Sequence, residues 1–204
     1  MLIIGLTGSM GMGKSAAAER FRFHGIPVCN ADSEVHKLYA GKAAPLIEAA
    51  FPGTTREGVV DRAKLSAALA ADAGGFKTLE AIVHPLVQSV EREFLHDAAR
   101  VGAAMAVLEI PLLLETGGDK TVDVVIVVSA PREVQETRVL ARPGMTRAKL
   151  EALLSRQLPD AEKRRRADFV VDTGGAIADS QVQIDSIVAA LANRSASAFE
   201  RYWA

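Results

Sequence analysis

The chain has 204 residues, of which 49% are hydrophobic and 24% are charged. This length allows one compact domain with a sizeable core and room for an inserted subdomain. The 24 basic and 25 acidic residues nearly cancel, so the chain lacks the overall positive field that attracts nucleic acid. The composition is typical of an ordinary globular protein with no nucleic-acid partner.

Redox and targeting signals both favour the cytoplasm. The single cysteine, Cys29, excludes an internal disulfide framework and suits a reducing compartment. The apolar run Met1–Leu6 is too short for a signal peptide and lacks its basic leader. No apolar stretch approaches the roughly 20 residues that span a membrane. We expect a cytoplasmic protein with no membrane partner, and no pattern indicates an obligate protein partner.

The first thirty residues predict a strand, a helix and a second strand. Met1–Leu6 (MLIIGL) is typical of a buried parallel strand. Lys14–Phe23 (KSAAAERFRF) favours a helix, and Gly25 stands where a C-terminal cap is expected. Ile26–Asn30 (IPVCN) reads as the next strand. The order is that of a βαβ unit.

The remainder of the chain alternates between helical and strand patterns. The stretch from about 33 to 100 is rich in alanine and helix formers, an arginine-rich helical segment runs from 132 to 166, and Ile177–Leu191 predicts a closing helix. Apolar strand patterns lie between these segments, at Ala103–Ile110, Val122–Val128 and, more weakly, Asp168–Asp172. We predict an open parallel α/β sheet with a helical insertion and a basic helical segment.

Between the first strand and the first helix lies the motif GSMGMGKS. Gly8, Gly13, Lys14 and Ser15 complete the pattern G-x-x-x-x-G-K-[ST] of a phosphate-binding loop. Glycines let backbone N–H groups turn inward around phosphate oxygens, and the following helix points its positive end at the same anion. Lys14 can reach the β- and γ-phosphates, and the Ser15 hydroxyl can ligate Mg²⁺. The predicted ATP-binding residues of this loop are Gly8, Ser9, Gly11, Met12, Gly13, Lys14, Ser15 and Ala16.

The same letters also fit a dinucleotide fingerprint. The stretch from Gly11 to Ala16 matches G-x-G-x-x-A, and Asp32 follows at nearly the distance of a ribose-binding acid. That fold does not need a Lys-Ser pair at the start of the helix, whereas a phosphate-transfer loop does. We therefore favour the phosphate-transfer loop over the dinucleotide site.

The phosphate loop is one of seven segments that form a more specific pattern together than the loop does alone. In chain order they are LTGSMGMGKS, VCNAD, VVDRAKL, IVHPLV, EIPLLLETG, ETRVLAR and RRRADFVVDTGG. In this combination the chain resembles the bacterial dephospho-coenzyme A kinases over nearly its whole length. The resemblance implies a P-loop kinase-type parallel sheet flanked by helices. It also implies transfer of a phosphoryl group from ATP, with Mg²⁺, to the 3′-hydroxyl of the ribose of dephospho-coenzyme A, the last step of coenzyme A synthesis.

The resemblance implies that three parts of a single P-loop kinase domain have different roles. The core would comprise about 1–32, 103–131 and 167–204. A helical insertion at about 33–102 would bind the acceptor, and a helical lid at about 132–166 would close over ATP.

Asp32 is the candidate catalytic carboxylate. A kinase acting on a hydroxyl needs a carboxylate that orients the acceptor oxygen and takes its proton. Asp32 follows the second strand at the edge where open α/β sheets bind ligands. The alternative from the residues alone is that Asp32 caps the next helix. The resemblance places Asp32 on the catalytic aspartate of the family, which commonly has Asp-Ala-Asp where this chain has Asn30-Ala31-Asp32.

Arg138 and Arg142 are four residues apart, so we expect them to share one helical face. The resemblance implies that they contact ATP from the lid, with Arg142 also catalytic, because guanidinium groups neutralise the moving phosphoryl charge. A solvated basic face is the alternative. The resemblance also makes Asp32, His84 and Leu112 candidate acceptor contacts, although a lone histidine is more often structural.

The second metal ligand stays open. Glu109 ends its predicted strand, where it faces either the Mg²⁺ shell or the turn at Pro111, while Asp123 begins its strand. Thr173 stands where the family often has Asn. A P-loop ATPase or nucleotide switch, and a nucleotide-binding protein without catalysis, remain as alternatives. The missing N-K-x-D pattern and the arginine-rich segment disfavour the first, and the intact Lys14-Ser15 pair disfavours the second.

Overall fold

The computed structural model describes residues 1–72 and 74–204. Its internal contacts divide the chain into two compact units. The first unit comprises Met1–Cys29 and Leu95–Ala204, and the second comprises Asn30–Phe94.

The first unit is built on a five-stranded sheet with the strand order β2-β5-β1-β6-β7. The pairs β1–β5, β1–β6 and β6–β7 are parallel. Every residue of β1 and β6 is buried, which explains their continuous apolar sequences: both faces of a parallel sheet are covered. The strands are β1 (Leu2–Thr7), β2 (Val28–Asn30), β5 (Met105–Glu109), β6 (Val124–Ser129) and β7 (Phe169–Asp172).

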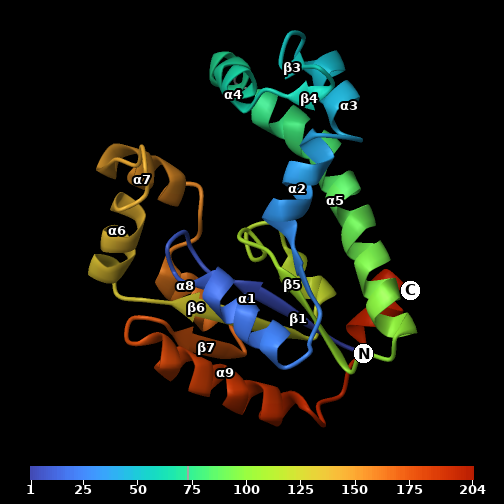
Figure 1. Cartoon of the computed structure of the whole chain (residues 1–204), viewed down its shortest axis with the longest axis vertical. Helices are drawn as coiled ribbons and strands as arrows, with labels where there is room; N and C mark the ends of the chain where they lie inside the picture. The colour runs from blue at the N-terminus through green and yellow to red at the C-terminus, as the bar shows by residue number, and fades with distance from the viewer. Residues whose placement is uncertain (73) are drawn as a thin grey trace. The chain divides into compact units, whose positions relative to one another are not determined.

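One face of this sheet packs against α1 (Lys14–Phe23) and α9 (Ile177–Leu191), which contact each other. Figure 1 shows both helices lying alongside the strands. The Arg20 guanidinium donates to both carboxylate oxygens of Asp185, at 2.7 and 2.6 Å. The main core lies on this side and includes Leu2, Ile4, Leu6, Phe21, Val124, Ile126, Val128, Ile184 and Ile187.

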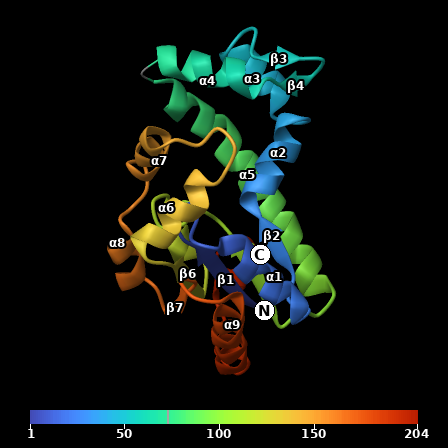
Figure 2. The same ribbon diagram turned by 60° about the vertical axis from the view of Figure 1, so that its left-hand side comes forward.

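The alternate residues of β6 point to the other face, because successive side chains of a strand alternate. Val125 and Val127 pack there against Leu113 and Leu114. In Figure 2 α8 lies beside β6, away from α1. The remaining elements of this unit are η1 (Gly118–Thr121), α6 (Arg132–Leu140), α7 (Arg147–Leu154), α8 (Asp160–Arg165) and the C-terminal η2 (Phe199–Trp203).

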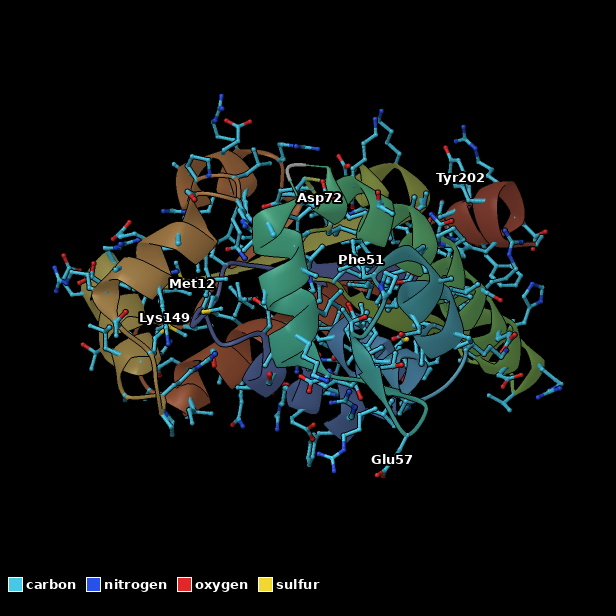
Figure 3. All side chains as sticks on the ribbon, turned by 90° about the horizontal axis from the view of Figure 1, so that it is seen from above. Met12, Phe51, Glu57, Asp72, Lys149 and Tyr202 are labelled. Atoms are coloured by element: carbon cyan, nitrogen blue, oxygen red, sulfur yellow. The ribbon has the colours of Figure 1, made fainter. Side chains whose placement is uncertain are left out.

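The second unit consists of helices around a small hairpin. Its elements are α2 (Ala31–Tyr39), α3 (Ala44–Ala50), β3 (Thr55–Arg56), β4 (Val59–Val60), α4 (Arg62–Ala71) and most of α5 (Gly75–Arg100), which continues through Pro85. Glu57 lies at the hairpin turn with a φ of 54° and projects from its tip in Figure 3. The core of this unit includes Leu38, Ile47, Phe51, Val60, Leu65 and Val83.

The strand and helix predictions are confirmed with small changes of length. The helices Lys14–Phe23 and Ile177–Leu191 have the predicted bounds. Predicted strand Ile26–Asn30 shortens to β2, and Ala103–Ile110 shortens to β5. The basic segment forms three separate helices, α6 to α8. Within the described residues, no helix is long and apolar enough to cross a membrane.

Candidate active site

The loop between β1 and α1 has the backbone conformation that its glycines predict. Gly8, Gly11 and Gly13 have φ values of 150°, 78° and 85°, which L side chains rarely adopt. A Cβ on Gly8 would lie 2.6 Å from the carbonyl oxygen of Val128, and one on Gly11 would lie 2.5 Å from Cγ2 of Val139. Backbone conformation and the neighbouring atoms therefore both require glycine here.

Lys14 begins α1 and turns back over the loop. Its Nζ donates to the carbonyl oxygen of Gly8 at 2.8 Å. Ser15 and Ala16 follow in the first turn of α1 and are exposed. First-turn N–H groups have no partner inside a helix, so the ammonium group, a hydroxyl and several backbone N–H groups gather at one helix end. Such an arrangement binds phosphate.

Buried side chains brace the loop from outside. Gln135 Nε2 donates to the Met10 carbonyl oxygen at 2.8 Å, and Thr173 Oγ1 donates to the Met12 carbonyl oxygen at 2.8 Å. The Ala130 N–H donates to the Met12 sulfur at 3.1 Å. Met12 is 3% exposed, and Figure 3 labels it on the loop before α1. Met12 is therefore a packing anchor of the loop.

The two predicted lid arginines do not share a helix, and the expectation of one helical face is wrong. Arg138 lies on α6 and donates from Nη2 to the Thr173 carbonyl oxygen at 2.6 Å. Helix α6 ends at Leu140, and Arg142 is exposed in the turn that follows. The reason is local: Pro143 disfavours helical backbone in the residue before it. The other terminal nitrogen of Arg138, Nη1, is buried without a hydrogen-bond partner in the described part of the chain.

A pocket of about 580 Å³ lies beside the loop. Ser129 at the end of β6 donates to Asp160 Oδ2 at 2.8 Å, so the pocket wall is internally hydrogen-bonded. The lining residues are Ser9, Met12, Ser129, Ala130, Pro131, Arg132, Gln135, Leu154, Leu158, Pro159, Asp160, Arg164, Val170 and Asp172. Residues from the loop, from the arginine-rich segment and from β7 thus share one cavity.

The segment after β5 is held by a buried ion pair that sequence reasoning missed. Lys163 of α8 has no exposed surface, pairs with Glu115 at 2.8 Å and donates to the Pro111 carbonyl oxygen at 3.3 Å. In sequence Lys163 is one charge in a charged helix, and its partner is far away along the chain. Leu112, a predicted acceptor contact, is 37% exposed in this segment.

Glu109 and Asp123 lie at opposite ends of the sheet. Glu109 is 3% exposed, ends β5 and pairs in register with Leu6 of β1. Asp123 precedes β6, and its carboxylate accepts from the N–H groups of Ile3 and Ser197 at 2.9 and 2.7 Å. Asp123 therefore has a structural role, and Glu109 is the carboxylate on the side of the phosphate loop. No group of three or more metal-ligating side chains was found among the described residues.

In the second unit, Asn30 and not Asp32 caps α2. The Asn30 side chain accepts from the Ser33 N–H at 2.8 Å, and Asp32 is the second residue of the helix with an exposed side chain. The alternative interpretation of Asp32 as a cap is therefore wrong. Asn can replace the Asp that the family commonly has at position 30, because Asn and Asp side chains cap helices equally well.

His84 lies on α5 with an exposed side chain next to the buried Val83. The imidazole of His84 is therefore open to solvent and not packed within the core. Its contact with the acceptor stays a prediction, as does that of Leu112.

The strand order argues against the dinucleotide site. In dinucleotide-binding folds the acid that binds ribose ends a strand directly beside the first strand. Here β5 lies between β1 and β2. The residues that match the fingerprint are therefore the end of the phosphate loop.

Comparison with known proteins points to one family. A family model described as dephospho-CoA kinase matches residues 2–179. The dephospho-CoA kinase of Brucella melitensis is 56% identical over 198 residues, 97% of this chain and 99% of that protein. The dephospho-CoA kinase of Mesorhizobium japonicum is 55% identical over 188 residues, 92% of this chain and 95% of that protein.

Solved structures give the same result. The protein TT1252 from Thermus thermophilus has a TM-score of 0.80 at 34% identity, covering 93% of this chain and 97% of that one. The dephospho-CoA kinase from Campylobacter jejuni has a TM-score of 0.70 at 25% identity, covering 93% and 96%. Shikimate kinase from Acinetobacter baumannii, with a TM-score of 0.54 at 17% identity over 94% and 93%, shares the P-loop kinase fold. The family match and the near full-length relatives together show that this chain belongs to the dephospho-CoA kinase family.

Proposed function

We propose that this kinase transfers the γ-phosphoryl group of ATP to the 3′-hydroxyl of the ribose of dephospho-CoA, giving CoA and ADP. The observation that carries the proposal is the phosphate loop, with three glycines at positive φ and Lys14 Nζ 2.8 Å from the Gly8 carbonyl oxygen, in a chain of this family. A cytoplasmic location stays a prediction from the sequence.

In this proposal the phosphate loop binds the β- and γ-phosphates through its backbone N–H groups and Lys14. The lysine ammonium offsets the charge that shifts from the γ-phosphoryl group to the leaving ADP. Ser15, exposed in the first turn of α1, supplies the hard oxygen ligand that Mg²⁺ prefers, so the residues fit this metal. Bound with ATP, Mg²⁺ would neutralise phosphate charge.

Asp32 is the proposed general base. Its carboxylate would orient the 3′-hydroxyl and take its proton while the oxygen forms a bond to the γ-phosphorus and the bond to the ADP oxygen breaks. The side chain is exposed and does not cap the helix. Both facts support a role in binding another molecule.

The proposed lid spans 132–166, with Arg138 and Arg142 contacting ATP. Contacts within the first unit indicate which part of the proposed lid can move. Helix α8 is anchored by the buried Lys163, whereas α7 is tied to α6 by surface ion pairs, such as Arg147 with Glu136 at 3.1 Å. Closing motions that exclude water commonly fall to such weakly anchored segments.

The alternative, a P-loop ATPase or nucleotide switch, transfers phosphate to water. ADP release measured with and without dephospho-CoA separates the two. The proposal predicts ADP release that depends on dephospho-CoA. Equal release without the acceptor would support an ATPase, and no release in either case would support a binding protein without catalysis.

A further inference from the structure

Two peptide units of the phosphate loop are held from outside by buried side chains. Gln135, which is 2% exposed, donates from Nε2 to the Met10 carbonyl oxygen at 2.8 Å. Thr173, which is 7% exposed, donates from Oγ1 to the Met12 carbonyl oxygen at 2.8 Å. Met10 and Met12 alternate with Gly11 and Gly13 along the loop, so each held carbonyl belongs to the peptide that precedes a glycine.

Each bond determines which way the next N–H points. The C=O and N–H of a trans peptide lie in one plane and point in nearly opposite directions, and no peptide in the described chain is cis. Holding the Met10 carbonyl toward Gln135 therefore aims the Gly11 N–H away from Gln135. Holding the Met12 carbonyl toward Thr173 aims the Gly13 N–H away from Thr173 in the same way.

These two N–H groups have no partner inside the described protein. The Met12 N–H donates to the Ser9 carbonyl oxygen at 3.2 Å. Among the described residues, Gly11 and Gly13 N–H groups donate no such bond. Their φ values of 78° and 85° belong to glycine, whose backbone turns over easily. A loop of this kind needs outside contacts to hold one peptide orientation.

Thr173 is itself firmly placed. Its N–H donates to the Ser129 carbonyl oxygen at 2.8 Å, and its own carbonyl accepts from Arg138. Its hydroxyl also lies 3.0 Å from the Ser129 carbonyl oxygen, so its single proton is shared between two acceptors. Atoms of its side chain lie 3.3–3.4 Å from where a Cβ of Gly13 would stand.

We propose that Gln135 and Thr173 are positioning residues that lock the Met10–Gly11 and Met12–Gly13 peptides, so that both glycine N–H groups face the phosphates of ATP. The inference rests on the proposed function, because it takes residues 8–15 as the ATP site. It assigns Thr173 a role in loop geometry through its side chain. A peptide that flips takes its N–H out of the site and lowers the fraction of binding-competent enzyme.

Substitutions graded by donor strength test the lock at Thr173. Thr173→Ser keeps the hydroxyl, Thr173→Cys offers a weak donor, and Thr173→Val has the shape without the donor. We expect the KM for ATP to rise about tenfold in Thr173→Val, the size expected for one lost hydrogen bond, and to stay within about threefold in Thr173→Ser. The KM for dephospho-CoA should stay within about twofold in both.

Gln135→Met should have the same selective effect on ATP, because it fills the space without donating. The matched control is Ser180→Ala, which removes a hydroxyl that is also 7% exposed but bonds to Ile177 within α9. The control should lower the melting temperature without changing the KM for ATP. Calorimetric affinity for an ATP analogue and amide NMR signals of Gly11 and Gly13 should follow the same order as the kinetics.

Each outcome decides the proposal. An unchanged KM for ATP in Thr173→Val, or equal losses in the Ser and Val variants, would overturn the lock. A parallel rise in both KM values would also overturn it. If Thr173→Val does not fold, the Ser and Cys variants decide, since they are similar in size and differ in donor strength. A wild-type enzyme without acceptor-dependent turnover would instead refute the proposed function.

Discussion

Replacing Asp32 with Asn removes the proposed base while leaving the helix start intact. The cap of α2 comes from the Asn30 side chain, which accepts from Ser33 at 2.8 Å. The substitution therefore removes only the favourable interaction of an exposed first-turn carboxylate with the helix dipole, about 0.3–1 kcal/mol. For a chain of this size, that corresponds to a melting temperature lower by about 1–4 °C.

The expected catalytic loss is far larger. General-base contributions amount to about 10²–10⁴-fold, so kcat should fall by that order in Asp32→Asn. The assay is acceptor-dependent ADP formation at saturating ATP and dephospho-CoA, together with thermal unfolding. Loss of activity without loss of fold is the combination that identifies a chemical role.

Glu34→Gln is the matched control. Glu34 is the other acidic residue in the first turn of the same helix, and it pairs with Lys37 at 2.7 Å. Its neutralisation has a similar effect on the helix dipole and should leave kcat within about twofold. An Asp32→Asn enzyme within about threefold of wild-type kcat would refute the assignment, as would an equal loss in Glu34→Gln.

Three further predictions test other parts of the site and fold. Lys14→Ala should reduce kcat by several orders of magnitude with an unchanged circular dichroism spectrum; near-normal turnover would contradict the phosphate-loop role. Arg142→Ala should lower kcat or raise the KM for ATP more than that for dephospho-CoA, and a selective acceptor defect in steady-state kinetics would contradict the lid. Burial raises the pKa of Glu91 from 4.5 to about 7, so the fold favours the neutral carboxyl group. The free energy of unfolding therefore falls as pH rises between these two values. Glu91→Gln should abolish that pH dependence and stabilise the protein at pH 8 by about 3 kcal/mol in denaturant titrations, since each pKa unit is about 1.4 kcal/mol; equal stability to wild type at pH 8 would contradict it.

Local patterns predicted the elements that carry the phosphate loop. The apolar run of β1, the glycines and the helix formers of α1 are neighbours in sequence, so their geometry follows from short-range preferences. The end of α6 before Arg142 was also readable, since Pro143 is a local signal. The residues alone left Asp32 open as either a base or a cap, because Asn30 and Asp32 are both good caps only two residues apart.

Long-range contacts were beyond sequence reasoning. Lys163 looks like an exposed helical charge until the fold brings it to Glu115 and the Pro111 carbonyl oxygen. Thr173 likewise contacts Met12 only because β7 and β1 lie in one sheet with β6 between them. A single sequence contains no periodicity that would reveal such pairs.

The most direct test of the central claim follows the phosphate itself. Purified enzyme is incubated with ATP, Mg²⁺ and either dephospho-CoA or its 3′-deoxy analogue, and products are quantified by chromatography and phosphorus NMR. The account predicts equal amounts of ADP and CoA, a new phosphomonoester at the ribose 3′ position, and no acceptor-dependent ADP with the 3′-deoxy analogue. Phosphate released to water, or transferred to the analogue at another position, would contradict it.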